Sequence, residues 1–220
     1  MTPPRTDVRV GVGISPRFLT LLTEEGLGGQ RVLDLGCGSG RLAFAVSPLA
    51  GWVVGLDRDA AAIAEAQRRA TAARLSHVEF HVADAEREEY GRWVPTLVTA
   101  HLCVADALIE RAGRALPRGG VLGMVAFHVD QWCETGRVSR FAYDEARMES
   151  VLRGASFQPE VVEVEREVKR FASVEEGLAA AVGLEDRWRA DGRWHRYIGF
   201  LEAGGRTLTR SHLIVKALRS

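Results

Sequence analysis

The sequence predicts an α/β fold with a single doubly wound, mostly parallel sheet of seven strands, the last of them antiparallel, and helices on both faces. Short apolar segments that are typical of buried strands alternate with helical patterns along the 220 residues. Several of these segments end in an acidic residue or a histidine, and glycines follow the first of them. The length suits one domain spanning 1–220, with an N-terminal helical segment over 1–29 and a core over 30–130.

The first half of the chain shows the clearest alternation. Ser15 and Pro16 are suited to the N-cap and the first position of a helix. The Ala-rich segment 59–74 places Ile63, Ala66 and Ala70 on one helical face. In chain order we expect helix 15–27, strand 31–36, a helix from 41 that stops around Pro48, strand 52–57, helix 59–74, strand 77–84, strand 96–102, helix 104–116 and strand 120–127.

The second half is expected to complete the sheet around an insertion. A helix over 141–154 should precede a long strand over 158–171, and a helical insertion over 173–204 should precede the last strand, 207–218. Segment 158–171 alternates polar and apolar residues, which is typical of an antiparallel or edge strand with one face in water. In folds with alternating strands and helices, ligands bind beyond the carboxyl ends of the parallel strands.

Composition narrows the classes of function and location. The formal net charge is zero, which argues against attraction of the whole molecule to nucleic acid or to an anionic membrane. The three cysteines are odd in number and widely spaced, and they form no CxxC pair. No apolar run is long enough for a signal-peptide core or a membrane span. We therefore expect a cytoplasmic protein without a membrane partner or a metal site, either a monomer or a homodimer.

The segment RVLDLGCGSGR, residues 31–41, brings glycines to the end of the first strand. Gly36, Gly38 and Gly40 form GxGxG, and Arg41 stands where the dinucleotide fingerprint has its third glycine. Asp34 precedes the glycines, and a carboxylate there would repel a pyrophosphate but attract a cation or an amine. The loop is therefore expected to face a ligand with an ammonium group and no phosphate.

VLDLGCGSG resembles the first motif of class I S-adenosylmethionine-dependent methyltransferases. Two further positions match the family: VVGLD ends in Asp57, and VADA supplies Asp84 with Ala85. The segment LPRGGVL also matches, so the resemblance covers residues 30–130. It implies S-adenosylmethionine as the cofactor, with Asp57 on the ribose hydroxyls and Asp84 on the adenine amine. The cofactor-binding residues that it implies are Asp34, Gly36, Cys37, Gly38, Gly40, Asp57, Arg58, Asp84, Ala85 and His101.

The chemistry of the ligand agrees with these assignments. Ribose hydroxyls and the adenine amine are hydrogen-bond donors, and a carboxylate at a strand end accepts them in charge-assisted bonds. Glycines let the methionine portion lie close to the backbone. The alternative for Asp57 and Asp84 is capping of the segment that follows each strand.

His101 is the candidate catalytic residue. Methyl transfer to a positioned nucleophile depends mainly on orientation and exclusion of water, and a base is needed only when a proton must leave first. His101 ends the fourth strand, where it could orient the acceptor, act as a base, or simply be a hydrogen-bonded loop histidine. His128 is a weaker candidate, and Cys103 is expected to be a small buried residue.

Several features bear on the methyl acceptor. Thr96 in PTLV stands where the family often has an acid, and the chain contains no NPPY-like segment and no PC pair. These absences argue against a nucleic-acid base as the acceptor. The insertion carries aromatic residues that could line a lid over the acceptor, pack in a core, or meet a dimer partner. They are Trp188, Trp194, Tyr197 and Phe200, together with His195.

The sequence is therefore expected to encode an S-adenosylmethionine-dependent methyltransferase acting on a small molecule. A protein or RNA acceptor is the second possibility. An inactive scaffold that binds S-adenosylmethionine is the third. A nicotinamide-dependent oxidoreductase is disfavoured by Asp34 and Arg41.

Overall fold

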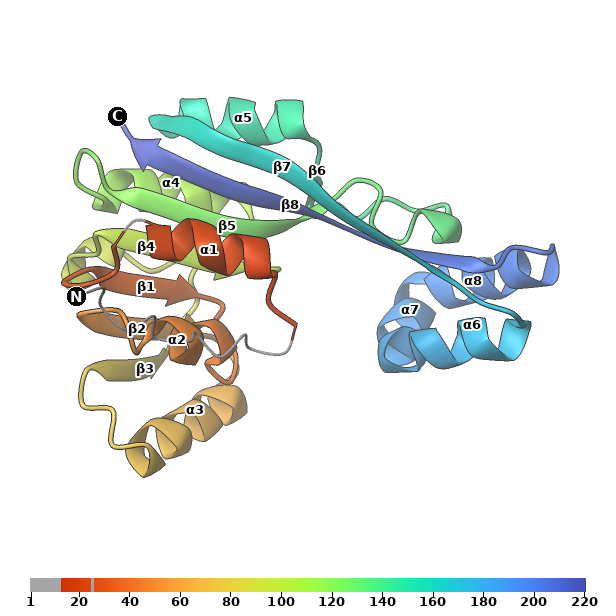
Figure 1. Cartoon of the computed structure of the whole chain (residues 1–220), viewed down its shortest axis with the longest axis horizontal. Coiled ribbons are helices and arrows are strands. Elements are labelled where there is room, and N and C mark those ends of the chain that lie inside the picture. Colours follow the sequence, from red (N-terminus) through yellow and green to blue (C-terminus); the bar gives the residue numbers. More distant parts are fainter. Residues whose placement is uncertain (1–12, 25) are drawn as a thin grey trace, which may run out of the picture. The chain divides into compact units, whose positions relative to one another are not determined.

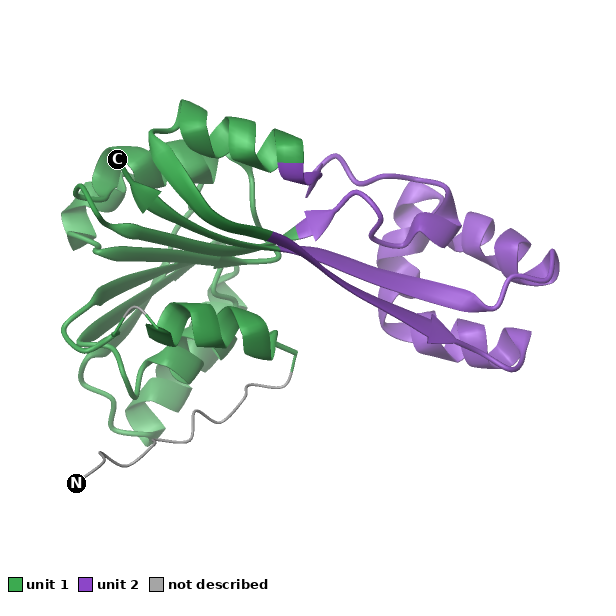
Figure 2. Cartoon of the chain, turned by 45° about the horizontal axis from the view of Figure 1, so that its top comes forward, with its two compact units in different colours: residues 1–126, 146–162, 214–220 green, residues 127–145, 163–213 purple. Residues whose placement is uncertain are grey.

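The computed structural model describes residues 13–24 and 26–220 (Figure 1). These residues form two compact units, which Figure 2 colours green and purple. Unit 1 comprises residues 1–126, 146–162 and 214–220, and unit 2 comprises 127–145 and 163–213. The two long strands β7 (Phe157–Arg170) and β8 (Thr207–Arg219) contribute residues to both units. The single domain expected over 1–220 stays a prediction.

The strands form the predicted sheet, in the order β3-β2-β1-β4-β5-β8-β7, with β6 paired to β5. The neighbours β1 and β2, β1 and β4, β2 and β3, and β4 and β5 are parallel. β8 runs antiparallel to β5, because the Gly119 amide donates to the Arg219 carbonyl and the Arg219 amide to the Gly120 carbonyl, each at 2.8 Å. The fold class is thus confirmed. The remaining strands are β1 (Arg31–Leu35), β2 (Trp52–Asp57), β3 (Val78–Val82), β4 (Leu97–His101), β5 (Val121–His128) and β6 (Ala142–Tyr143).

Helices cover both faces of the sheet in unit 1 (Figure 2). The helices α1 (Pro16–Glu24), α2 (Arg41–Val46) and α3 (Ala60–Ala72) share one hydrophobic core with β1, β2 and β3. α4 (Asp106–Ala115) and α5 (Glu145–Gly154) lie on the other face. The expected cap is confirmed, since Ser15 Oγ accepts the Phe18 amide at 3.3 Å. None of the helices in the described ranges is long and apolar enough to cross a membrane.

The helix expected over 141–154 begins later than the sequence pattern indicates. Ala142 and Tyr143 instead form β6, in parallel register with Phe127 and His128 of β5. The buried ring of Tyr143 explains this departure, because pairing with β5 places it in the interior. Helix α5 then starts at Glu145, an acidic residue in the first turn, which suits the positive end of the helix dipole.

Unit 2 has an aromatic core of its own. The insertion folds as α6 (Val174–Ala181), a 3₁₀ turn, α7 (Glu185–Asp191) and α8 (Arg193–Glu202). The Trp188 ring meets Trp132 and Tyr197 edge-on, with centroid distances of 5.2 and 5.4 Å. Trp188 and Tyr197 are fully buried and Trp194 is nearly so. The interpretation of these three aromatic residues as core residues is therefore confirmed.

Trp188→Ala should destabilise unit 2 strongly, because truncation of a fully buried tryptophan leaves a large cavity. We expect a loss of about 3–5 kcal/mol in the free energy of unfolding. Urea unfolding followed by far-UV circular dichroism measures it. Val182→Ala is the matched control, since the Val182 side chain is exposed and its removal should change stability by less than about 0.5 kcal/mol. Equal stability of the two variants would contradict the assigned core.

Candidate active site

The loop from β1 to α2 needs glycine for different reasons at different positions. Gly36, Gly38 and Gly40 all have positive φ, at 61°, 54° and 83°. A Cβ on Gly36 would lie 2.5 Å from the Cys103 sulfur, so close packing excludes a side chain there. A Cβ on Gly38 would meet nothing within 4 Å. The backbone at Gly38 is therefore open to the approach of a ligand.

Two side chains from neighbouring elements hold this loop. Asp57, at the end of β2, accepts the Gly38 amide on Oδ2 at 2.7 Å and the Asp59 amide on Oδ1 at 2.9 Å. Arg69 of α3 donates to the Ser39 carbonyl at 2.7 Å. A carboxylate offers about four lone-pair sites, so these two bonds leave Asp57 with capacity for ligand hydroxyls.

Asp34 is buried at the end of β1, with 1% of its surface exposed. Its Oδ1 accepts the Thr99 hydroxyl at 2.9 Å, and its Oδ2 has no protein partner. Burial raises the pKa of Asp34 to about 7; the Thr99 hydroxyl and the Ala43 backbone amide oppose this shift, and the nearby Asp57 carboxylate adds to it. Asp34 is thus a carboxyl group that can change charge near neutral pH.

Asp84 lies beside Asp57 because β2 and β3 end together. The Ala83 amide donates to the Asp57 carbonyl at 2.9 Å. Asp84 Oδ1 accepts the Glu86 amide at 3.0 Å, which makes the local turn that the capping alternative anticipates. Its other oxygen lies 3.6 Å from Arg87 Nε. The side chain is about half exposed, so its remaining lone pairs are accessible.

The three other expected cofactor residues have different surroundings. Arg58 follows Asp57 and is exposed. Ala85 is half-buried, and its carbonyl accepts the Tyr90 hydroxyl at 2.5 Å. Cys37 is buried, and its amide donates to the Leu56 carbonyl at 3.0 Å. Cys37 therefore contributes packing and backbone anchoring to the loop.

His101 ends β4 on the other side of β1. Arg41 Nη2 lies 3.3 Å from His101 Nδ1, and the Phe18 ring packs near the imidazole at a centroid distance of 6.3 Å. Leu102, directly after His101, has a φ of 63°, which is rare for a residue with a side chain. The chain therefore turns sharply where His101 leaves the sheet. Residues with strained backbone of this kind are common at functional sites.

Residues 28–165 match the family described as "Methyltransferase domain". The chain belongs to this family. The similar solved structures share the Rossmann-like fold found here, and they include methyltransferases with bound S-adenosylmethionine or S-adenosylhomocysteine as well as the [4+2]-cyclase SpnF, which is 25% identical with a TM-score of 0.62 and covers 91% of this chain and 79% of that one.

Proteins similar to this chain differ in the methyl acceptor that their names state. The YcgJ protein of Bacillus subtilis has a TM-score of 0.69 and 15% identity, covering 92% of this chain and 98% of that one. Magnesium protoporphyrin IX methyltransferase of Synechocystis, with bound S-adenosylmethionine, has a TM-score of 0.60 and 17% identity, covering 93% and 76%. A 23S rRNA (uracil-C5)-methyltransferase of Methylococcus capsulatus is 43% identical over 65 residues, 29% of this chain and 15% of that enzyme. The first curated relatives are matched over 15% to 64% of their own length.

The residues present fit the methyltransferase cofactor. Gly38 offers an open stretch of backbone, and Asp57 and Asp84 offer carboxylate acceptors at neighbouring strand ends. The buried Asp34 oxygen without a partner is suited to a positively charged ligand. Within residues 13–24 and 26–220, no three His, Cys, Asp or Glu side chains gather where they could hold a metal ion.

The two remaining candidates from the sequence, Cys103 and His128, both form hydrogen bonds within the fold. Cys103, expected to be buried, is only partly buried; its thiol donates to the Leu35 carbonyl at 3.0 Å, and desolvation raises the pKa of the thiol to about 12. His128 belongs to unit 2, where its Nδ1 lies 2.9 Å from the buried Ser211 hydroxyl. Both residues are hydrogen-bonded within the fold.

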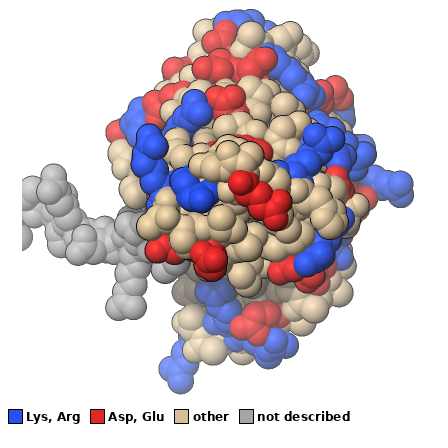
Figure 3. Space-filling view, turned by 90° about the vertical axis from the view of Figure 1, so that its right-hand side faces the viewer, with Lys and Arg blue, Asp and Glu red and all other residues tan. Residues whose placement is uncertain are grey.

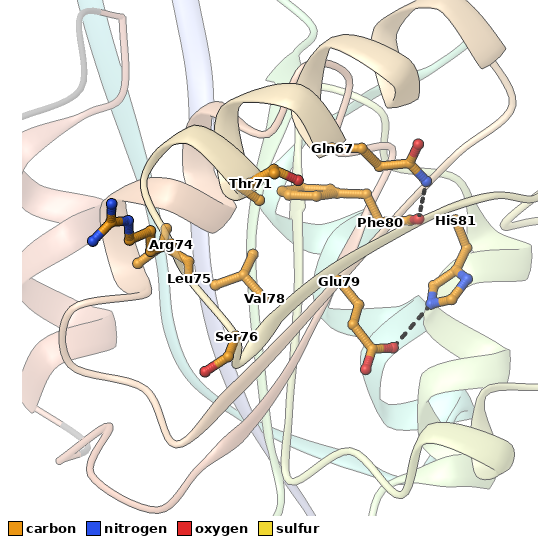
Figure 4. A pocket seen from close by; sticks show the side chains of 10 residues that line it. Gln67, Thr71, Arg74, Leu75, Ser76, Val78, Glu79, Phe80 and His81 are labelled. Carbon is orange, nitrogen blue, oxygen red and sulfur yellow. Dashed lines mark hydrogen bonds and ion pairs between the residues drawn. The ribbon is translucent and has the colours of Figure 1, made fainter.

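A pocket of about 550 Å³ lies between α3 and β3 (Figure 4). Gln67 donates to the Phe80 carbonyl at 2.9 Å there, which covers a polar group on the edge strand. His81 and Glu79 pair at 3.1 Å beside it. None of the predicted site residues lines this pocket, so it is distinct from the candidate active site.

Sequence reasoning missed the residues that support the site. Thr99 of β4, which holds Asp34, and Arg69 of α3, which holds the loop, carry no local signal, because their partners are about 65 and 30 residues away in the chain. In the sequence, Arg41 differs from its surroundings only as a departure from the dinucleotide fingerprint. Thr96, which stands where the family often has an acid, accepts the Arg31 amide on its hydroxyl at 2.9 Å.

Asp34→Asn should change how stability depends on pH. Between the ordinary pKa of 3.8 and the folded value of about 7, the folded state binds a proton that the unfolded state releases. Stability therefore falls as pH rises through this range, by up to about 4 kcal/mol at about 1.4 kcal/mol per pH unit. The isosteric Asn side chain carries no charge and lacks this contribution.

Urea unfolding of both proteins at about pH 5 and pH 8 measures the effect, and the variant should gain relative to the wild type at the higher pH. Parallel profiles would show that Asp34 has an ordinary pKa in the folded protein.

Proposed function

We propose that the protein transfers a methyl group from S-adenosylmethionine to a small-molecule acceptor. The hydrogen bond from the Gly38 amide to Asp57 carries the proposal, because it joins the open glycine loop to the acid that would bind the ribose. The family membership of residues 28–165 supports the same cofactor. The proposal also places the protein in the cytoplasm, in keeping with three cysteines that form no disulfide.

The chain would act mainly by holding the reactants in line. S-adenosylmethionine supplies a methyl group already activated on a sulfonium. The loop over Gly36–Gly40 would hold the methionine portion, Asp57 the ribose hydroxyls and Asp84 the adenine amine. Since Asp57 and Arg69 fix the loop before a ligand arrives, little conformational entropy remains to be lost on binding.

We propose His101 as a residue that orients the acceptor. An arginine side chain can only donate, so Nδ1 of the neutral imidazole accepts from Arg41 and the ring proton resides on Nε2. A base would need a lone pair, and the Nδ1 lone pair already accepts from Arg41. Arg41 therefore favours a role for His101 as a donor, and Arg41 itself is a positioning residue.

Two properties favour a small-molecule acceptor over RNA: the balanced charge of the protein and the raised pKa values of two cysteine thiols. The formal net charge is zero. Among the described residues facing the viewer in Figure 3, acidic and basic side chains are interspersed, without a large basic patch. Burial raises the pKa of the Cys37 and Cys103 thiols, so neither is suited to act as a thiolate nucleophile on a pyrimidine.

The acceptor class can be tested with S-adenosylmethionine labelled in the methyl group. The purified protein is incubated separately with a low-molecular-weight metabolite extract, with total RNA and with a protein fraction. We expect enzyme-dependent label in the small-molecule fraction alone. Label in RNA or protein would overturn the acceptor assignment, and S-adenosylmethionine binding without transfer to any fraction would indicate a scaffold.

Asp57→Ala should weaken binding of S-adenosylhomocysteine by about 1.5–3 kcal/mol, the scale for loss of a charged hydrogen-bond partner. The variant loses both the ribose acceptor and the anchor of the Gly38 amide. Calorimetric titration measures it. The matched control is Asp59→Ala, which removes the N-cap of α3 and should lower stability by about 1 kcal/mol without weakening binding. Unchanged affinity in Asp57→Ala would remove Asp57 from the site.

His101→Ala should reduce kcat at least about tenfold and leave S-adenosylhomocysteine affinity within about twofold, because an orienting group acts on the acceptor. Steady-state kinetics with the acceptor found above and calorimetric titration separate the two effects. His81→Ala is the control, since His81 is partly exposed and pairs with Glu79 on β3. A fall in affinity with unchanged kcat would make His101 a cofactor contact only.

A further inference from the structure

Four arginine side chains of unit 2 surround a single carboxylate where α7 meets α8. Asp191, the last residue of α7, pairs with Arg193 Nη1 at 3.0 Å, and its backbone carbonyl accepts a hydrogen bond from Arg137. Arg187 lies one turn before Asp191 on the same face of α7. Arg196 lies one turn after Arg193 on the same face of α8. Among the described residues, Asp191 is the only acid that forms an ion pair with this arginine cluster, so the four guanidinium groups leave an excess of three positive charges.

Arg193 is the buried member of the arginine cluster. Only 7% of the residue is exposed, and its guanidinium lies over the Trp132 ring, with Cζ 5.7 Å from the ring centroid. Its Nε is buried and has no hydrogen-bond partner. Burial lowers the pKa of Arg193; Asp191 opposes this shift, and the nearby Arg137 and Arg187 add to it. A buried cation with an unused donor and cationic neighbours is costly for the fold unless an anion binds beside it.

The N-terminus of α8 adds to the same positive potential. Its N-cap is Gly192, which has no side chain to accept the amides of the first turn, and that turn contains no acidic residue. Asp191 Oδ1 accepts the Arg193 amide at 3.2 Å. Arg193 and Arg196 themselves place cations at the end of the helix where the macrodipole is already positive. The arginine cluster therefore coincides with a helix end that attracts anions.

The loop before β6 brings Arg137 to this helix end. A Cβ on Gly136 would lie 3.8 Å from Arg196 Nη1, so the loop passes beside α8. The hydrogen bond from Arg137 to the Asp191 carbonyl caps the C-terminus of α7, which explains Arg137 without a ligand. It does not explain Arg187 and Arg196, whose side chains are exposed and form no ion pair with an acid of the described residues.

We propose that the arginine cluster binds a dianionic phosphate group, carried by a small phosphorylated molecule or by free inorganic phosphate. A guanidinium presents a planar fork of N–H donors that matches two phosphate oxygens at once. The exposed Arg187 and Arg196 contact the phosphate oxygens, and the buried Arg193 raises the local potential from within the fold. A phosphate offsets the excess charge more fully than a carboxylate, because it carries up to two negative charges.

This site is separate from the proposed methyl transfer. All of its residues belong to unit 2, and none of them is among the residues proposed to bind S-adenosylmethionine. Failure of phosphate binding would therefore leave the proposed function unchanged.

The test is calorimetric titration of the full chain with inorganic phosphate, with glycerol 3-phosphate and with glycerol, in a buffer without polyvalent anions. We expect both phosphates to bind and glycerol not to bind. Tighter binding of glycerol 3-phosphate than of inorganic phosphate would identify a phosphorylated molecule as the ligand, and the reverse order would identify free phosphate.

The variants Arg187→Gln and Arg196→Gln locate the site. Both residues are exposed, so the fold should be kept, and each variant should weaken phosphate binding at least about tenfold, the scale for loss of a hydrogen bond to a charged group. Arg189→Gln is the matched control, because Arg189 lies on the same helix and its guanidinium is already paired with Glu185 at 2.6 Å. The control should leave the affinity within about twofold of the wild type.

Absence of phosphate binding by the wild type would overturn the inference. An equal loss of affinity in Arg187→Gln and Arg189→Gln would do the same, because phosphate would then respond to the general charge of α7. The full chain is also titrated with a short single-stranded oligoribonucleotide. Preference for this oligonucleotide over glycerol 3-phosphate, lost in Arg187→Gln, would show that the arginine cluster contacts a nucleic-acid backbone and would contradict a site for a small phosphorylated ligand.

Discussion

The hydrogen bond between the Gly38 amide and Asp57 is the contact on which the candidate site depends. It joins two features of different origin: a loop whose left-handed backbone requires glycine and an acid at the end of the neighbouring strand. Parallel strands make the contact possible, because β1 and β2 end at the same edge of the sheet. With Asp57 in place, the backbone turns toward open space at Gly38 and the loop needs little rearrangement to receive a ligand.

Most of the fold and the strand-end acids could be predicted because they depend on local pattern. The apolar segments that form β1, β2 and β3, and the acids at or near their ends, can be recognised without knowledge of the packing. The two-residue strand β6 could not, since it exists only by pairing with β5. The same holds for Thr99 beside Asp34 and for Arg41 beside His101, whose partners are about 60 residues away.

The second unit shows how an insertion can stabilise itself. Its aromatic side chains pack against one another, around Trp188. The outer part of β7, residues 163–170, is exposed along an edge of the sheet and carries acidic and basic side chains between its valines. Charged side chains on an edge strand oppose pairing with another chain, so the long strand remains compatible with a monomer as well as with a dimer formed elsewhere.

The buried carboxyl of Asp34 is costly for folding, which makes its presence informative. A leucine or an asparagine at the end of β1 would avoid the loss of stability that ionisation of a buried acid brings above neutral pH. The Thr99 hydroxyl and the Ala43 backbone amide stabilise the ionised carboxylate, but its Oδ2 accepts no hydrogen bond of ordinary geometry. Stability sacrificed at a site that adjoins an open glycine loop is the pattern expected where a ligand supplies the missing charge.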